Sequence, residues 1–136
     1  MSLDVYLTAT VPTTVFDANI THNLGKMAGE AGIYEALWRP AEMDPERKAR
    51  IQAQAKAGNY HGPDGAYAIE AEVVTYARDL IEPLRAGLAL LRADPERFEK
   101  HNPENGWGSY RDFVPWVARY LQACEEYPDA EVRVSR

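Results

Sequence analysis

The sequence contains a single cysteine and has no apolar run approaching the roughly 20 residues needed to cross a membrane. Cys124 therefore cannot form an internal disulfide. Its position on a regular apolar stripe favours the role of a small buried side chain. The N-terminal residues show no basic stretch followed by an apolar one, so no secretory signal is visible. These absences predict a cytoplasmic protein with no membrane segment.

Basic residues and catalytic motifs are also scarce. The chain has 15 lysines and arginines against 21 aspartates and glutamates, a formal net charge of −6, so it lacks the basic surface that binds duplex nucleic acid. No nucleophile elbow, P-loop, dinucleotide-binding glycine motif or Cys-x-x-Cys pair is present. His22, His61 and His101 lack metal-ligand spacing. We therefore expect neither a metal nor a cofactor.

What the sequence does contain is enough apolar material for one compact domain. Its 136 residues are 46% hydrophobic, and a chain of this length buries about 68% of its unfolded surface. Alternating residues predict strands at 3–10, 68–75 and 131–134, the last at a sheet edge. Apolar residues at helical spacing predict helices at 20–31, 80–92 and 112–125. The expected fold is α+β: a single domain (1–136) with a small, about three-stranded sheet that includes both terminal strands, and three or more helices on one face.

Local signals predict where two of these helices begin and end. Asn19 has the character of an N-cap for the first helix, and Gly32 stands where a C′ glycine belongs. The last helix can begin after Ser109 or near Asp112. We favour Asp112, because that start places Pro115 in the first turn, where a missing N–H costs little.

A separate helix is predicted before the middle of the chain. Asp44 followed by Pro45 is typical of a helix start, and the helical pattern continues to Lys56. Ile51 is its only large apolar residue. We therefore interpret residues 41–67 as a surface helix and loop inserted beside the core.

The first candidate site is the start of the helix predicted after Asn19. At 100° per residue His22 points nearly opposite the buried stripe, and unpaired N–H groups in a first turn favour anions. Thr21, His22 and Asn23 can then surround a phosphate or carboxylate. The alternative is an ordinary capped helix with a solvated histidine. Asp17 can also approach His22 across the helix start, as a minimal acid/base pair.

The second candidate site is the glycine-rich loop before the last helix. Trp107 lies between two glycines, where no helical or strand period explains an aromatic residue. Either Trp107 plugs the core and the asparagines brace the loop, or Trp107 and Tyr110 form a stacking platform. In the second case Asn102 and Asn105 recognise the polar edges of a ligand.

A third candidate is Arg39, which follows Trp38. Its guanidinium can stack on an aromatic ring or clamp a carboxylate of a partner. The commoner role for such an arginine is a buried structural ion pair.

Three segments carry a resemblance to known sequences: NITHNLGKMA at 19–28, YEALWRP at 34–40, and most of 79–136. They resemble a family of small uncharacterised proteins encoded by bacteriophages and prophages. The resemblance implies phage origin and action in the bacterial cytoplasm. It implies no activity, because the family has none assigned. Small phage proteins outside the virion often bind host factors, including defence systems, which is an analogy at the level of lifestyle.

The leading expectation is therefore a phage-encoded, non-enzymatic binding protein whose partner is a host protein or a small anionic metabolite. Its surface would combine the start of the first helix with the Trp107 loop. One alternative is a small hydrolase or transferase that uses His22 with Asp17. Another is a minor structural or assembly factor. A single cleft lined by His22, Asn23, Arg39 and Trp107 would favour ligand binding or catalysis, whereas dispersal of these residues would favour a flat protein interface.

Overall fold

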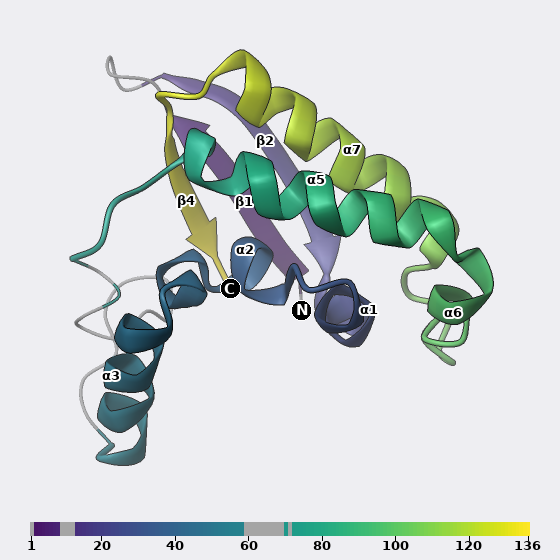
Figure 1. The fold of residues 1–136 in the computed structure, drawn as a ribbon, viewed down its shortest axis with the longest axis horizontal. Coiled ribbons are helices and arrows are strands. Elements are labelled where there is room, and N and C mark those ends of the chain that lie inside the picture. The colour runs from purple at the N-terminus through teal and green to yellow at the C-terminus, as the bar shows by residue number, and fades with distance from the viewer. Residues whose placement is uncertain (1, 9–12, 59–69, 71) are drawn as a thin grey trace.

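A computed structural model describes residues 2–8, 13–58, 70 and 72–136, which form two layers (Figure 1). One layer is an antiparallel sheet with strand order β2-β1-β4-β3. Its strands are β1 (Ser2–Thr8), β2 (Thr14–Thr21), β3 (Thr75–Tyr76) and β4 (Glu131–Ser135). The helical elements are η1 (His22–Leu24), α1 (Gly25–Glu30), α2 (Tyr34–Trp38), η2 (Pro40–Met43), α3 (Pro45–Lys56), α5 (Ala77–Ala93), α6 (Pro95–Glu99) and α7 (Tyr110–Glu126). The predicted α+β class is confirmed, and so is the presence of both terminal strands in one sheet.

The sheet is built around β1, which pairs with β2 on one side and β4 on the other. Leu3, Val5 and Leu7 are fully buried on its inner face, as the alternating pattern predicts. The edge position predicted for β4 is wrong, because β3 pairs with it on the far side. Of the described residues in the strand predicted at 68–75, only Thr75 belongs to β3. Positions 68, 69 and 71 lie outside the described residues.

The assignment of Asn19 as a helix N-cap is wrong. Asn19 lies inside β2 and pairs with Asp4 of β1, and Thr21 caps the following η1 by accepting a hydrogen bond from the Asn23 N–H (3.2 Å). Pairing with β1 overrides the local preference of asparagine for helix starts. Ile20 is buried all the same, because the inner face of the strand coincides with the first position of the predicted stripe.

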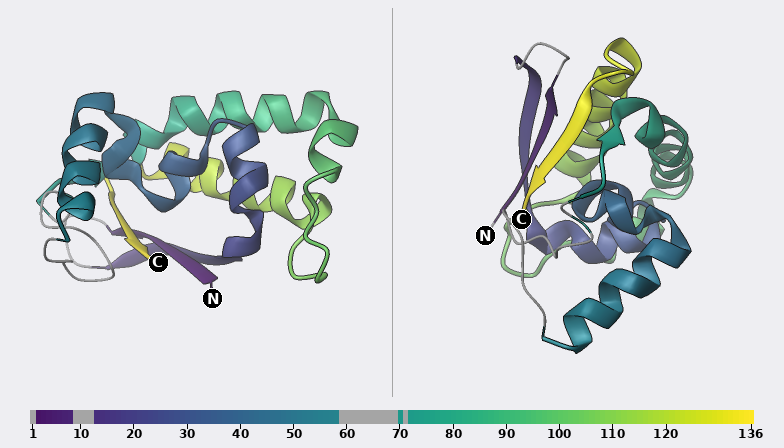
Figure 2. Two further views of the ribbon diagram at one scale, coloured as in Figure 1. Left: turned by 90° about the horizontal axis from the view of Figure 1, so that it is seen from below. Right: turned by 90° about the vertical axis from the view of Figure 1, so that its left-hand side faces the viewer.

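The helical layer covers one face of the sheet, and α5 and α7 run side by side across it (Figure 2). The buried residues of α7 are Ala123 and the predicted stripe of Phe113, Trp116, Val117, Tyr120, Leu121 and Cys124. Trp116 also donates its Nε1–H to the carbonyl of Asn19 in β2 (3.0 Å), which ties α7 to the sheet. Within the described part of the chain, no helix combines the length and the hydrophobicity that crossing a membrane demands.

The predicted start of α7 at Asp112 is also wrong. Ser109 is the N-cap, and its hydroxyl accepts a hydrogen bond from the Asp112 N–H (3.2 Å). Pro115 therefore sits at the sixth helical position, where its missing N–H leaves the carbonyl of Arg111 without an intrahelical donor. Arg111 is exposed, so water can satisfy that carbonyl, and the proline is tolerated.

Residues 40–56, which comprise η2 and α3, form an arm that projects from the end of the sheet–helix body (Figures 1 and 2). As predicted, Asp44 caps α3, Pro45 begins it and Lys56 ends it. Ile51 is the only buried residue of α3, and it lies outside the contiguous hydrophobic cluster of the body. The rest of the predicted insertion, from position 59 on, lies outside the described residues.

Candidate functional site

A cleft opens where the chain leaves β2 and turns into η1, at the side on which the loop between α6 and α7 returns. The cavity measures ≈ 620 Å³, and its lining residues are Ser2, Asn19, Thr21, His22, Asn23 and Trp107. The two segments singled out in the sequence thus meet, although they lie far apart along the chain. A hydrogen bond from Asn23 Nδ2 to the carbonyl of Trp107 (3.5 Å) connects them.

The loop can approach η1 because residue 108 is a glycine. Gly108 has φ +96°, a left-handed conformation that glycine adopts without strain. A Cβ at this position would lie 2.7 Å from Thr21 Cγ2 and 3.0 Å from Leu24 Cγ. The glycine therefore serves both the backbone turn and the close packing that forms one wall of the cleft.

Trp107 is presented to solvent rather than packed into the core. Its side chain is 71% exposed, whereas Trp38 and Trp116 are 2% and 4% exposed. The backbone around it is braced: Asn105 Oδ1 accepts the Trp107 N–H (3.0 Å) and Asn102 Oδ1 accepts the Tyr110 N–H (2.7 Å). The two asparagines thus hold the loop, as one of the two sequence interpretations proposed, while Trp107 follows the other interpretation.

Tyr110 does not share a platform with Trp107. It is half-buried against the core and donates its hydroxyl hydrogen to the carbonyl of Leu91 (2.6 Å), which anchors the first turn of α7 to the end of α5. Asn102 and Asn105 do not line the cleft either. The aromatic platform is therefore the single indole of Trp107.

Arg39 lies in a different pocket, beside the arm. Its guanidinium bonds the carboxylate of Glu42 at 3.2 Å, and Glu42 is buried. The structure therefore contains the structural ion pair, which was the alternative to a partner-binding role for Arg39. Of the four residues proposed to share one cleft, three do so, and Arg39 does not.

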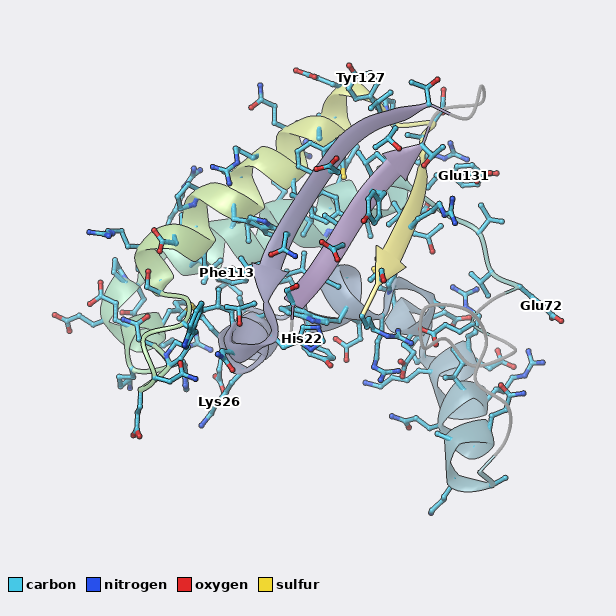
Figure 3. The ribbon with its side chains drawn as sticks, turned by 180° about the vertical axis from the view of Figure 1, so that it is seen from behind. His22, Lys26, Glu72, Phe113, Tyr127 and Glu131 are labelled. Atoms are coloured by element: carbon cyan, nitrogen blue, oxygen red, sulfur yellow. The ribbon has the colours of Figure 1, made fainter. Side chains whose placement is uncertain are left out.

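His22 is partly buried and lines the cleft (Figure 3 labels its side chain). Its ring meets Trp38 edge-on, with centroids 5.9 Å apart and an interplanar angle of 90°. The Nε2 atom is enclosed and has no hydrogen-bond partner among the described residues. The sequence argument placed His22 on an exposed helix face, but the end of a strand turns its ring toward the body instead.

Asp17 and His22 are not brought together. Asp17 and Thr21 both lie in β2, four residues apart. An extended strand rises about 3.3 Å per residue, so these two positions are about 13 Å apart, and His22 follows Thr21. Asp17 is therefore not placed to orient His22 as a general base. The acid/base pair suggested by the sequence is not formed.

A polar network on the outer face of the sheet supports the cleft. Asn19 Nδ2 donates to Ser2 Oγ (2.9 Å) and to Asp4 Oδ1 (2.8 Å), so a carboxylate stands directly beside the lining residues. Sequence reasoning missed Ser2 and Asp4, which belong to no motif. In the sequence, these two residues are marked only by the alternation that places them on the outward face of β1. Their place beside the cleft follows from the pairing of Asp4 with Asn19.

Other reactive chemistry is sparse in the part of the chain that the structure describes. No group of three or more histidine, cysteine, aspartate or glutamate side chains there has an arrangement that can hold a metal ion. Burial raises the pKa of the Cys124 thiol to about 12, so it stays protonated and unreactive at neutral pH. Comparison with protein-family models, curated proteins and solved structures found no match to this chain.

Proposed function

We propose that this protein is a non-enzymatic binding protein that takes its partner in the Trp107 cleft. The observation that carries the proposal is an indole exposed by 71% on a loop that hydrogen bonds hold in place. Tryptophan is enriched among the residues that dominate binding energies, and a braced loop loses little conformational freedom when a partner binds. The cavity of ≈ 620 Å³ also falls within the range of ligand pockets.

The two alternative functions have less support. A hydrolase or transferase that uses His22 would need an accessible base nitrogen and an orienting carboxylate, whereas Nε2 is enclosed and Asp17 is distant. A minor structural or assembly factor needs only a flat surface and gives no reason for a concave cleft beneath a presented indole.

The nature of the partner and the origin of the protein are part of the same proposal. The resemblance to proteins of bacteriophages and prophages supports a phage-encoded protein that acts on a host protein or a small metabolite in the bacterial cytoplasm. The anionic partner expected from the sequence has less support than an uncharged one, because none of the six residues lining the cleft is a lysine or arginine.

The test compares three forms of the full chain: wild type, Trp107→Ala and Tyr127→Ala. Tyr127 is an exposed residue at the end of α7 and lies far from His22, so it serves as a matched control (Figure 3). Each form is used for affinity enrichment from bacterial lysate, with mass spectrometry of both bound proteins and bound small molecules. We expect a partner that wild type and Tyr127→Ala retain and Trp107→Ala loses. Identical partner sets for all three forms would refute the proposal.

A further inference from the structure

We propose that the Trp107 cleft binds an uncharged purine base or its nucleoside. This inference rests on the proposed function and names the ligand of the same cleft. The lining combines one exposed indole with two side-chain amides, two hydroxyl groups and an imidazole. None of these six residues is a lysine, arginine, aspartate or glutamate. A surface of this kind suits a flat ring with polar edges and no charge.

The indole of Trp107 supplies the stacking surface. Planar heteroaromatic rings stack on exposed tryptophan because each has a π face, and the interaction requires no charged group. The neighbouring backbone is held by Asn105, so the indole stands on a fixed support before the ligand arrives. A purine offers a larger flat face than a pyrimidine, which favours it on this platform.

Asn23 supplies the polar recognition beside the indole. Its side chain is exposed, and its bond to the carbonyl of Trp107 is long (3.5 Å), so a ligand can replace that bond at little cost. A carboxamide presents a donor and an acceptor side by side, which matches the N6–H and N7 edge of adenine. The amide donor of Asn19 is already used by Ser2 and Asp4, which leaves Asn23 as the amide available for a ligand.

The charge around the cleft selects against phosphate. The carboxylate of Asp4 lies 2.8 Å from the amide nitrogen of Asn19, and the whole chain carries a net charge of −6. Both repel a phosphate group, and no lysine or arginine stands among the described lining residues to compensate. A nucleoside should therefore bind better than the corresponding nucleotide. Single-stranded nucleic acid binds in a positively charged groove, and the lining of this cleft does not provide one.

Quenching of tryptophan fluorescence by a ligand reports on Trp107, because Trp38 and Trp116 are buried and shielded from contact with the ligand. Wild-type protein is titrated with adenosine, adenosine monophosphate, glucose and inorganic phosphate. We expect saturable quenching by adenosine and binding of the monophosphate weaker by about tenfold or more. Glucose and phosphate should produce no saturable change. Tighter binding of the monophosphate, or saturable binding of glucose in place of adenosine, would overturn the assignment.

Calorimetric titration of adenosine into variants then tests the named residues. Trp107→Ala and Asn23→Asp should each weaken binding by at least about tenfold, since one removes the stacking surface and the other replaces a donor with a charge. Trp107→Phe should retain part of the affinity, and Tyr127→Ala should retain all of it. Adenosine affinity that is absent in wild type, or unchanged in Trp107→Ala, refutes the purine assignment. A Trp107-dependent partner found in lysate alongside such a result would leave the proposed function standing.

Discussion

Two helices with equally clear sequence signals contribute very differently to the molecule. Both α7 and α3 begin with a capping side chain. In α7, however, seven of 17 residues are buried against α5 and the sheet, whereas in α3 only Ile51 of 12 residues is buried. Capping decides where a helix begins, and the width of its apolar stripe decides whether it belongs to the core. The contrast separates a cooperative body from an arm.

The arm meets the body through η2, where Ala41 and Glu42 are buried and Met43 packs against the hydrophobic cluster, and through single contacts from α3. Lys48 of α3 donates to Glu35 of α2 (2.9 Å), and Ile51 packs outside the main hydrophobic cluster. The hydrogen bond from Arg47 Nε to the carbonyl of Ala41 (2.7 Å) stays within the arm. Within this arm, α3, with one buried apolar residue and an ion pair whose side chains are about a third exposed, is expected to open locally before the body unfolds. Four predictions test this division.

The largest effect is expected for Trp116→Ala. Trp116 is buried between α7 and β2 and hydrogen-bonds the carbonyl of Asn19, so its removal should lower the free energy of unfolding by about 3–5 kcal/mol. Trp107→Ala is the control, because the exposed indole contributes little to the folded state, and its change should stay within about 0.5 kcal/mol. Denaturant unfolding measures both. Similar large losses would make Trp107 part of the core and remove the platform.

Gly87→Ala should destabilise the body by about 1–3 kcal/mol. A Cβ there would lie 2.2 Å from Ile33 Cγ2 and 3.2 Å from the backbone oxygen of Ala31, so α5 cannot approach the 31–33 turn without a shift. This clash outweighs the higher helix propensity of alanine. Gly29→Ala in α1 is the matched control, because a Cβ there meets nothing within 4 Å. Thermal unfolding should show Gly29→Ala unchanged or slightly stabilised. A stabilised Gly87→Ala variant would contradict the close packing.

Ile51→Ala should release the arm while leaving the body folded. The loss in global stability should be smaller than for Gly87→Ala, because it is bounded by the free energy that docks the arm. Hydrogen exchange monitored by mass spectrometry should show faster exchange in α3 and unchanged protection in α5 and α7. Arg50→Ala, an exposed neighbour, is the control. Increased exchange throughout α5 and α7 would show that the arm and the body unfold as one unit.

The smallest effect is expected from acidification. The hydrogen bond from Lys48 lowers the pKa of Glu35 below its ordinary value of 4.5. The resulting stabilisation is complete above pH 4.5 and is lost as the pH falls through the lowered pKa. Both side chains are about a third exposed, so solvent screening keeps the contribution small. The protection of α3 against hydrogen exchange, corrected for the intrinsic exchange rate at each pH, should fall in that acidic range in wild type, but show no such additional fall in Glu35→Gln. Identical pH profiles would exclude this ion pair as a tether.

Local sequence signals were sufficient where short-range geometry governs the outcome. Asp44 and Pro45 predicted the start of α3, Gly32 adopts the φ +75° expected of a C′ glycine, and the stripe from Phe113 to Cys124 is the buried face of α7. Each of these depends on residues within about one or two helical turns of each other. The exposure of Trp107 was only one of two alternatives that the sequence left open, because an aromatic between two glycines fits no period and can be either packed or presented.

Sequence-based prediction failed where contacts with residues distant in the chain determine the local structure. Asn19 has the preferences of a helix cap, but its place in β2 is set by pairing with Asp4 of β1, which no local pattern encodes. His22 was placed by helix geometry that the strand replaces, and its enclosed Nε2 follows from contact with Trp38.

The sequence by itself determined the fold class, the α3 helix and the two segments of interest. Only the tertiary structure decided that those segments face each other, because Gly108 must pack against Thr21 and Leu24 for the loop to close on η1. Only the tertiary structure excluded Arg39, Asp17 and Tyr110 from the cleft and brought Ser2 and Asp4 to it. A binding site depends on the positions of side chains in space, and the pairing of β1 with β2 sets those positions over distances that helical and strand periods do not reach.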